Sequence, residues 1–391
     1  MINDKASLVQ IPSGYKSGTL YSVVPNTADG DFTVTGDPQG EATRVNKDGL
    51  IETVSANVPR LNYDFIDGVV QPDPHLLLEP ERTNSLTYSE DFTGSNWFIQ
   101  NSASLTPNNV VAPDGTLTAS TLQNADGTSI SGNVLQKNIT FSSDCVTSIY
   151  IKSLGSTTVA LCSRTANGTQ TFTSYNISGN EWKRFDRFIN ASSSALNQFS
   201  IGGTNGDIAV WGAQVEAGSY PTSYIPTSGS AVTRTEDFCF INSGLQDILN
   251  TNEGTLFVEV EVPRVSSTGS FERITLSDQN ASTDRILFDN YGGNWRALML
   301  STAGNVNKTI VSVTANQRIK VAIAYSSTEL RISYDGNTAT TTSGSYTPTT
   351  TLESFKFSNK DGGNKWQGKI HQAMYFDTAL TDAELIALTS G

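Results

Sequence analysis

The sequence predicts an all-β protein in which two antiparallel β-sandwiches follow a mostly irregular N-terminal leader. Short apolar runs alternate with polar residues at the two-residue period of strands, and Gly, Asn, Asp and Ser bound them. Only 16% of the residues are charged, so the polarity comes mainly from neutral side chains, a composition typical of strands and turns. Helix signals are few, which excludes a helical core.

The strand signals are clearest in the last third of the chain. Thr255–Val262 alternates apolar and polar residues, and Lys320–Tyr325 is a second apolar run. Leu330–Tyr334 and Asn337–Thr340 flank Asp335-Gly336, a pair that supplies the positive φ angles of a type I′ turn. These runs predict an antiparallel sheet with at least one tight hairpin.

One helix is expected at the end of the chain. Thr381 and Glu384 have the spacing of a capping box, in which the Thr hydroxyl accepts from a backbone amide and the Glu reaches back. Leu385, Ile386 and Leu388 follow on one helical face. So short a helix can cover a sheet but cannot build a core.

The length of the chain and its proline- and glycine-containing segments divide it into three parts. At 391 residues it is too long for one ordinary core. A proline-rich segment at Val69–Pro74 and the connector Gly218–Ser230 mark the boundaries. They predict a leader over 1–68 and sandwiches over 69–235 and 236–391. The leader holds few large apolar residues, so we expect it to need a partner, either another copy of the chain or a docking protein. We expect residues 61–391 to fold without it.

Charge and composition exclude several classes of function. Lys+Arg 25 against Asp+Glu 38 gives a net charge of -13, which disfavours nucleic acid and anionic lipid as partners. No run approaches the ~18–20 apolar residues of a membrane span, and Met1–Lys5 does not begin a signal peptide, so synthesis in a cytoplasm is expected. The three cysteines are widely spaced and predict no disulfide framework: Cys145, Cys162 and Cys239.

Several segments resemble a module of tailed-bacteriophage structural proteins. The motifs flank the central block and are Leu76–Asn84, Thr87–Phe92, Asn96–Trp97 and Val210–Thr227. In those proteins the module is a jelly-roll sandwich similar to carbohydrate-binding modules. Two earlier segments look like the leader that accompanies it, Ile11–Ser22 and Ala42–Glu52. The C-terminal third resembles a concanavalin A-like, laminin-G-type sandwich through Gly254–Val258, Gly368–His371 and Ala379–Leu385.

The resemblance implies a virion protein of the tail-fibre or head-fibre type, made in the cytoplasm of a bacterial host. It would be anchored to other virion proteins through residues 1–68 and would bind host cell-surface glycans without catalysis, for adsorption. Phage fibres are commonly threefold, so a homotrimer is expected. Attachment to tail or capsid stays open. One alternative is a purely structural decoration or spacer without ligand, and a second is a polysaccharide depolymerase.

The residues themselves favour binding over catalysis. His75 and His371 are the only histidines, and neither lies beside a nucleophile motif, so no catalytic triad is predicted. Near pairs such as Glu79/Glu81 and Glu90/Asp91 are expected by chance among 38 acidic residues. We therefore predict no catalytic residue and no enzymatic activity.

No cofactor is predicted apart from calcium, for which the candidates are weak. The related jelly-roll modules often hold a structural calcium through an acidic residue near the closing strand, but Val210–Ala213 has no carboxylate here. Carboxylates in Asp- and Asn-rich turns are the remaining candidates, because calcium prefers oxygen ligands: Asp126, Asp284, Asp289 and Asp361.

Sugar recognition calls for flat aromatic rings that stack on a pyranose. Trp211 lies in the closing strand and is expected in the core. Trp295 follows the turn after Tyr291, and Trp366 follows a Gly- and Asn-rich turn. The predicted glycan-binding residues are Tyr291, Trp295, Trp366 and Trp97.

Overall fold

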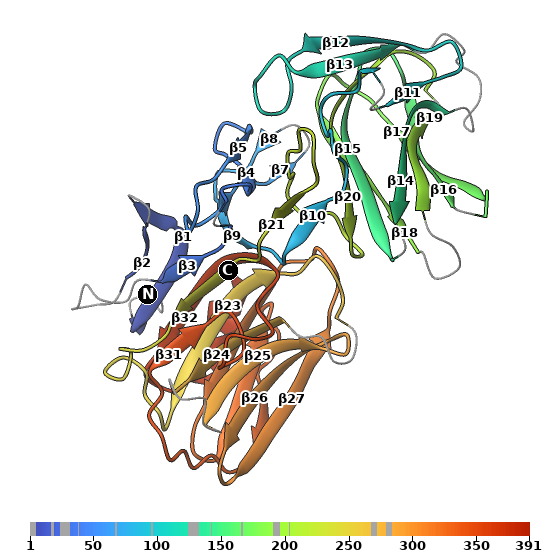
Figure 1. The fold of residues 1–391 in the computed structure, drawn as a ribbon. Helices are drawn as coiled ribbons and strands as arrows, with labels where there is room; N and C mark the ends of the chain where they lie inside the picture. Colours follow the sequence, from blue (N-terminus) through green and yellow to red (C-terminus); the bar gives the residue numbers. More distant parts are fainter. Residues whose placement is uncertain are drawn as a thin grey trace.

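A computed structural model of the protein describes residues 5–16, 19–23, 32–37, 39–66, 69–94, 97–123, 133–141, 143–165, 167–190, 196–202, 204–266, 272–278 and 284–391. Figure 1 shows two β lobes, an upper one in green and a lower one in yellow to red, with the blue N-terminal strands beside the lower lobe and between the two. The fold is all-β and antiparallel, as predicted. No helix in the described part of the chain is long and apolar enough to cross a membrane.

The upper lobe is a sandwich of two five-stranded antiparallel sheets. The β19 sheet has the order β11 (Phe98–Ile99), β14 (Asn133–Phe141), β19 (Leu196–Gly202), β16 (Thr158–Thr165) and β17 (Gln170–Asn176). The β20 sheet has the order β12 (Ser104–Val110), β13 (Ala119–Gln123), β20 (Ile208–Ala217), β15 (Cys145–Ser153) and β18 (Lys183–Ile189). Apolar residues on their facing sides enclose one core, which includes Phe199 and Trp97.

The lower lobe is a larger sandwich. The β25 sheet has the order β27 (Gly304–Ser312), β26 (Asn294–Ser301), β25 (Arg285–Tyr291), β24 (Glu272–Ser277), β31 (Ser354–Lys356), β22 (Phe238–Ile241) and β3 (Thr33–Thr35). The β23 sheet has the order β2 (Thr19–Val23), β1 (Leu8–Lys16), β32 (Gly368–Phe376), β23 (Gly254–Glu261), β28 (Ile319–Tyr325), β29 (Glu329–Tyr334) and β30 (Thr340–Ser343). Both sandwiches match the predicted fold class.

The leader differs from the irregular segment that the sequence predicted. Strand β1 pairs with β32, and β3 pairs with β22, so the leader adds a strand to each sheet of the lower lobe. Leu8 and Phe32 lie in the core of that lobe. Strand β9 (His75–Leu78) also pairs with β32, and β6 (Leu61–Asn62) pairs with β9. The leader needs no core of its own because its few large apolar side chains enter the core of the C-terminal sandwich.

A second part of the leader covers the upper lobe. The hairpin of β4 (Thr43–Val45) and β5 (Ile51–Thr53) places Ile51 in an apolar cluster with Trp211 and Tyr224. Trp211 is thus buried, as predicted, on the outer side of the β20 sheet. A smaller hairpin follows, formed by β7 (Phe65–Ile66) and β8 (Val69–Val70).

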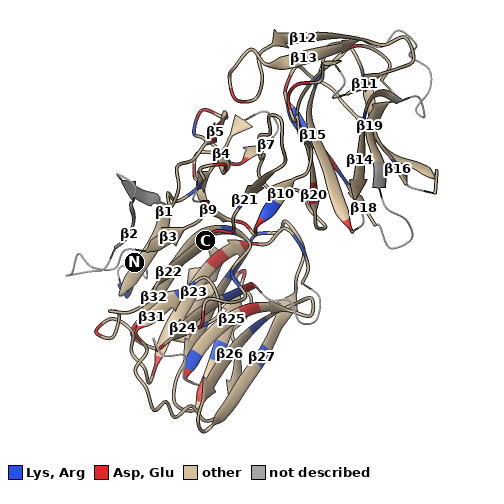
Figure 2. Cartoon of the chain, in the orientation of Figure 1, with Lys and Arg blue, Asp and Glu red and all other residues tan. Residues whose placement is uncertain are grey.

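One buried ionic cluster joins the three parts of the chain. Elsewhere, charged residues are thinly scattered over the strands of both lobes (Figure 2). Arg60 of the leader is 2% exposed and pairs with Glu79 at 2.7 Å and with Asp237. Arg234, 0% exposed, lies 3.6 Å from Glu79 and 3.7 Å from Asp237. A two-stranded sheet of β10 (Arg82–Asn84) and β21 (Val232–Arg234) lies next to this junction in the chain.

The predicted helix and turn are both present. Helix α1 (Asp382–Ser390) has the capping box of Thr381 and Glu384, and it buries Leu385 and Leu388 on the outer side of the β23 sheet. Asp335 and Gly336 have φ angles of 43° and 71°, the positive values that a type I′ turn requires.

Candidate functional site

The structure places four of the five tryptophans inside cores. Trp97, Trp211, Trp295 and Trp366 are at most 2% exposed. Trp295 stacks on Phe288 at 4.9 Å in the core of the lower lobe, and Trp366 lies 5.9 Å from Trp295. Trp97, Trp295 and Trp366, predicted to bind glycan, therefore present no face to a sugar. Sequence position next to a turn did not reveal which side of the sheet each ring occupies.

Tyr291 is the predicted glycan-binding residue that stays half-buried. It lies at the end of β25, and the hairpin register pairs it with Asn294 across a two-residue turn. Successive residues of a strand point to opposite faces, so Trp295 turns inward while Arg296 turns outward. The Arg296 guanidinium lies 3.8 Å from the centre of the Tyr291 ring and so occupies one face of it.

The described calcium candidates are engaged by the protein itself. Asp289 accepts two hydrogen bonds from Arg296, at 2.9 and 2.8 Å. One oxygen of Asp284 accepts from the backbone amides of two threonines, and Asp361 accepts from an amide in its own turn. Asp126 lies outside the described residues. No group of three or more potential metal ligands occurs within the described ranges, so calcium binding stays a prediction without support from these carboxylates.

The two histidines lie together at the junction of the leader and the lower lobe. Their rings are 5.4 Å apart, with His75 on β9 and His371 on β32. His75 is fully buried, and its Nε2 lies 3.2 Å from the amide of Asn62. Burial lowers the pKa of His75 to about 3 and that of His371 to about 4. Both rings are therefore neutral at pH 7 and pack as structural side chains.

Trp182, which sequence reasoning did not select, is the tryptophan that is not in a core. It precedes β18, is half-buried, and lines a groove of about 770 Å³ between the leader and the upper lobe. Its Nε1 donates to the carbonyl of Val111 at 2.9 Å, which fixes the plane of the ring. The groove also receives Phe65 from the β7–β8 hairpin and Tyr150 from β15. We name this feature the Trp182 groove.

Polar side chains form the rim of the Trp182 groove. Asn180, Glu181 and Lys183 are exposed and line it. Arg184 is held in place, because its guanidinium donates to Ser148 at 2.9 Å and lies over the Tyr150 ring at 5.4 Å. A fixed aromatic ring beside amide, carboxylate and ammonium groups can stack on a sugar and hydrogen-bond to its hydroxyls.

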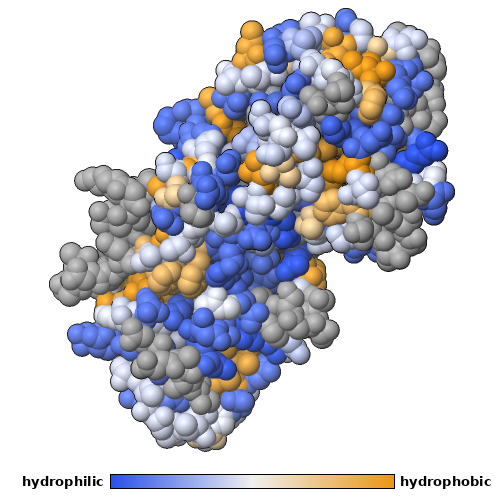
Figure 3. Space-filling model, viewed as in Figure 1, coloured by the Kyte–Doolittle hydropathy of each residue, from blue (hydrophilic) through white to orange (hydrophobic). Residues whose placement is uncertain are grey.

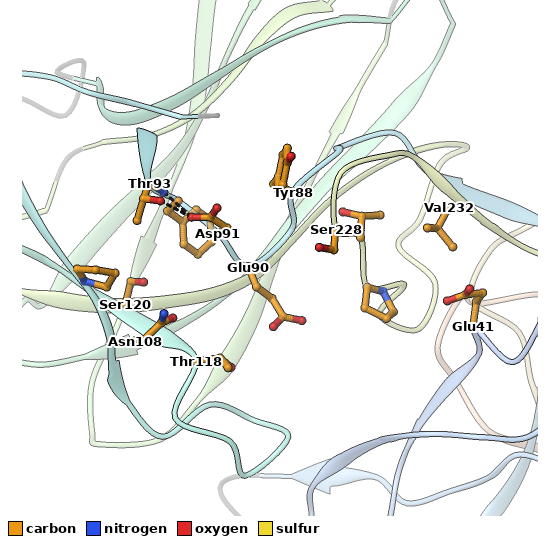
Figure 4. A pocket seen from close by; sticks show the side chains of 14 residues that line it. Glu41, Tyr88, Glu90, Asp91, Thr93, Asn108, Thr118, Ser120, Ser228 and Val232 are labelled. Atoms are coloured by element: carbon orange, nitrogen blue, oxygen red, sulfur yellow. Dashed lines mark hydrogen bonds between the residues drawn. The ribbon is translucent and has the colours of Figure 1, made fainter. Parts of the chain in front are cut away.

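A second cavity, of about 530 Å³, lies where the leader, the start of the upper lobe and the connector meet. Figure 4 shows the side chain of Glu90 near the middle of the residues that line this hollow and that of Glu41 at its edge, near Val232. Asp91 also lines it. We name it the Glu90 cavity. Burial raises the pKa of Glu90, a hydrogen bond from Tyr224 at 2.8 Å opposes the rise, and the charge of Asp114 adds to it.

Comparison with known proteins bears mainly on the lower lobe. Residues 241–386 match the family described as the Concanavalin A-like lectin/glucanases superfamily. The match spans most of the C-terminal sandwich but less than half of the chain. No curated protein matches the chain significantly.

Two solved structures are among those that the chain partly matches. A carbohydrate-binding module, the Ruminococcus gnavus IT-sialidase CBM40 bound to alpha2,3 sialyllactose, is 12% identical, with 36% of this chain and 84% of that chain covered and a TM-score of 0.31. Domains LG4-5 of the mouse laminin alpha1 chain are 10% identical, with 62% and 86% covered and a TM-score of 0.29. Neither likeness decides what this chain binds. Residues 241–386 are thus similar in sequence to a concanavalin A-like lectin domain.

Proposed function

We propose that this protein binds host cell-surface glycans without turning them over, through the Trp182 groove. The observation that carries the proposal is that Trp182 is partly exposed in a groove and hydrogen-bonded in place, whereas the other four tryptophans are buried. Aromatic stacking is the main apolar contact that a sugar offers, and a ring that is already oriented loses little entropy when it binds. The lectin-type match of residues 241–386 independently supports a glycan as ligand.

We further propose that the protein is a fibre or appendage of a tailed-phage virion. The resemblance of the sequence motifs supports this role. Docking through residues 1–68 has support from exposed apolar residues on the leader: Phe65 is 46% and Ile66 53% exposed. Apolar patches interrupt a largely hydrophilic surface (Figure 3). A homotrimer would multiply weak single-site affinities through effective concentration, and light scattering of the full-length chain tests it.

A glycan array probed with the full-length protein tests the glycan proposal. We expect Trp182→Ala to lose binding by about tenfold or more, because a sugar loses its stacking surface. Phe172→Ala is the matched control, since this ring is 47% exposed on a strand outside the groove, and it should keep full binding. Binding that survives Trp182→Ala would refute the groove. A wild-type chain that binds no glycan would favour the spacer alternative.

The depolymerase alternative also has one observation in its favour. Glu41 and Glu90 both line the Glu90 cavity (Figure 4), and glycosidases use two carboxylates on either side of the bond that they cleave. Under the binding proposal, purified protein leaves capsular and lipopolysaccharide chains at full length. Shortening that disappears in Glu90→Gln would establish the enzyme instead.

A further inference from the structure

The outer face of the β19 sheet carries a polar hollow of about 620 Å³. Strands β14, β19 and β16 lie side by side in this sheet (Figure 1). Gln198 of β19 lies opposite Asn138 of β14 on one side and Arg164 of β16 on the other, and directly opposed residues share one face of a sheet. All three line the hollow. Residues of the opposite parity on β16 and β19, Leu161 and Phe199, enter the core, so these three side chains point away from it.

Arg164 brings to this face a positive charge that no described residue neutralises. Its side chain is exposed, and its guanidinium makes no hydrogen bond or ion pair with any described residue. The five strands of the sheet contain two cations, Lys137 and Arg164, and no Asp or Glu, although the chain has 38 acidic residues against 25 basic ones. The face therefore favours an anion, which the net charge of the chain would otherwise repel.

Neutral polar side chains place hydrogen-bonding groups beside the guanidinium. Gln198 is 8% exposed, and its Nε2 donates to Oδ1 of Asn138 at 3.3 Å. This bond orients the exposed Asn138 amide, whose Nδ2 donates to no described residue. Thr140, which is exposed two residues further along β14, adds a hydroxyl to the lining. Amide and hydroxyl groups can donate to and accept from the hydroxyls of a sugar, so the hollow combines a partner for an anion with partners for a polyol.

We propose that this hollow binds an acidic sugar of the uronic acid class, with its carboxylate paired to Arg164 and its hydroxyls bonded to Asn138 and Thr140. A guanidinium can bind a carboxylate through two parallel hydrogen bonds, which gives direction as well as charge. We name this place the Arg164 site. It shares no described lining residue with the Trp182 groove. The inference goes beyond the proposed function, because it assigns a second site and a charged class of sugar that the groove does not specify.

Calorimetric titration of the full chain with three matched solutes tests the proposal. Glucuronate carries both the carboxylate and the hydroxyls, glucose has a neutral group in place of the carboxylate, and acetate has the carboxylate without the ring. We expect glucuronate to bind at least tenfold more tightly than glucose or acetate, with a dissociation constant of the order of 1 mM, and to bind more weakly when salt is added. Glucose or acetate that binds as tightly as glucuronate, or glucuronate that does not bind, would overturn the proposal.

Variants locate the binding on this face. Arg164→Gln should weaken glucuronate binding about tenfold and Asn138→Ala about threefold, because each removes one contact. Both positions are exposed, so urea unfolding should show unchanged stability. Lys308→Gln removes a positive charge from β27 of the lower lobe, and as the control for charge it should change nothing. Glucuronate binding that survives Arg164→Gln unchanged would refute the assignment.

The two proposed sites can fail separately. Trp182→Ala should leave glucuronate binding intact, since the Trp182 groove lies on the other sheet of the upper lobe. Arg164→Gln should leave binding to the glycan array intact, because the washing of an array removes protein that is held only with millimolar affinity. Loss of glucuronate binding in Trp182→Ala would place the acidic sugar in the groove and overturn the Arg164 site.

Discussion

Replacing Arg60 by methionine removes one of the two guanidinium groups from the buried ionic cluster at the junction of the leader and the two lobes. Glu79 and Asp237 would then share Arg234 alone, whose guanidinium lies 3.6 and 3.7 Å from them. Arg60 is the closer partner, at 2.7 Å from Glu79. The variant therefore leaves an uncompensated negative charge in a site from which water is excluded.

The structure gives the size of the effect in two ways. Glu79 is buried, and although burial raises its pKa, Arg60 and Arg234 lower it to about 2. A fall from 4.5 to about 2 corresponds to about 3 kcal/mol of stabilisation of the charged form. Breaking a buried pair by removing one partner costs about 3–5 kcal/mol. We therefore expect Arg60→Met to lower the free energy of unfolding by about 3–5 kcal/mol.

Urea unfolding followed by tryptophan fluorescence measures the change. Arg44→Met is the matched control, because Arg44 pairs with Glu52 in the same leader but at a partly exposed position, and it should cost less than about 1 kcal/mol. The double variant Arg60→Met, Glu79→Gln restores the balance of charge with Arg234 and Asp237. It should be less destabilised than the two single variants added together.

The pH dependence carries the decisive outcome. The folded pKa of Glu79 is below its unfolded value of 4.5, so its contribution is complete above pH 4.5 and is lost as the pH falls toward 2. In Arg60→Met the cation nearest to Glu79 is gone, so the Glu79 carboxylate can be protonated, and thereby neutralised, at low pH. The difference in stability between wild type and variant should shrink from pH 7 to pH 3. A difference below about 1 kcal/mol at pH 7, or one that does not change with pH, would refute this account of the cluster.

Acid should also act through His75 and His371, whose pKa values burial lowers from 6.5 to about 3 and about 4. Below pH 6.5 the unfolded chain binds more protons than the folded chain. Urea titrations should therefore show the free energy of unfolding falling by about 1.4 kcal/mol per pH unit for each histidine down to about pH 4. This loss should be smaller in the variant in which both histidines are replaced by glutamine. The sequence led us to expect that residues 61–391 fold without the leader. Because that chain lacks β1 and β3, which pair with strands of the lower lobe, we now predict that it unfolds at lower urea than the full chain or aggregates. Thr381→Ala should cost about 1 kcal/mol in thermal unfolding, because helix α1 loses its cap.

The sequence predicted aromatic side chains as the sugar-binding groups, but it did not predict which rings are accessible. Trp295 and Trp366 enter the core, whereas Trp182 stays partly exposed. The reason is the two-residue period of a strand: one step along the chain reverses the face, and the sequence near Tyr291 does not say which face is inside. Nothing local marks Trp182, because its groove forms only when the leader folds back on the upper lobe.

For the leader, too, the sequence predicted a general property but not the contacts that the folded chain makes. Its shortage of apolar residues predicts that it needs a partner, either another copy of the chain or a docking protein, and in the structure it packs on the C-terminal sandwich of the same chain. The sequence around Leu8 and Phe32 does not predict which strands these residues pack beside. Strands β1 and β32 are joined by backbone hydrogen bonds, which any residue except proline can make. Pairing over such a distance in sequence is therefore invisible to local pattern.

The sequence by itself determined the all-β class, the antiparallel sandwiches, the Asp335-Gly336 turn and the capped helix, because each follows from local periodicity, turn chemistry or capping. Only the tertiary structure decided that the leader completes the lower lobe, that Arg60, Glu79 and Asp237 meet in one buried cluster, and that Glu41 and Glu90 line one cavity. These features bring together residues from distant parts of the chain, and what fixes them is the burial of apolar surface and charge summed over the whole molecule.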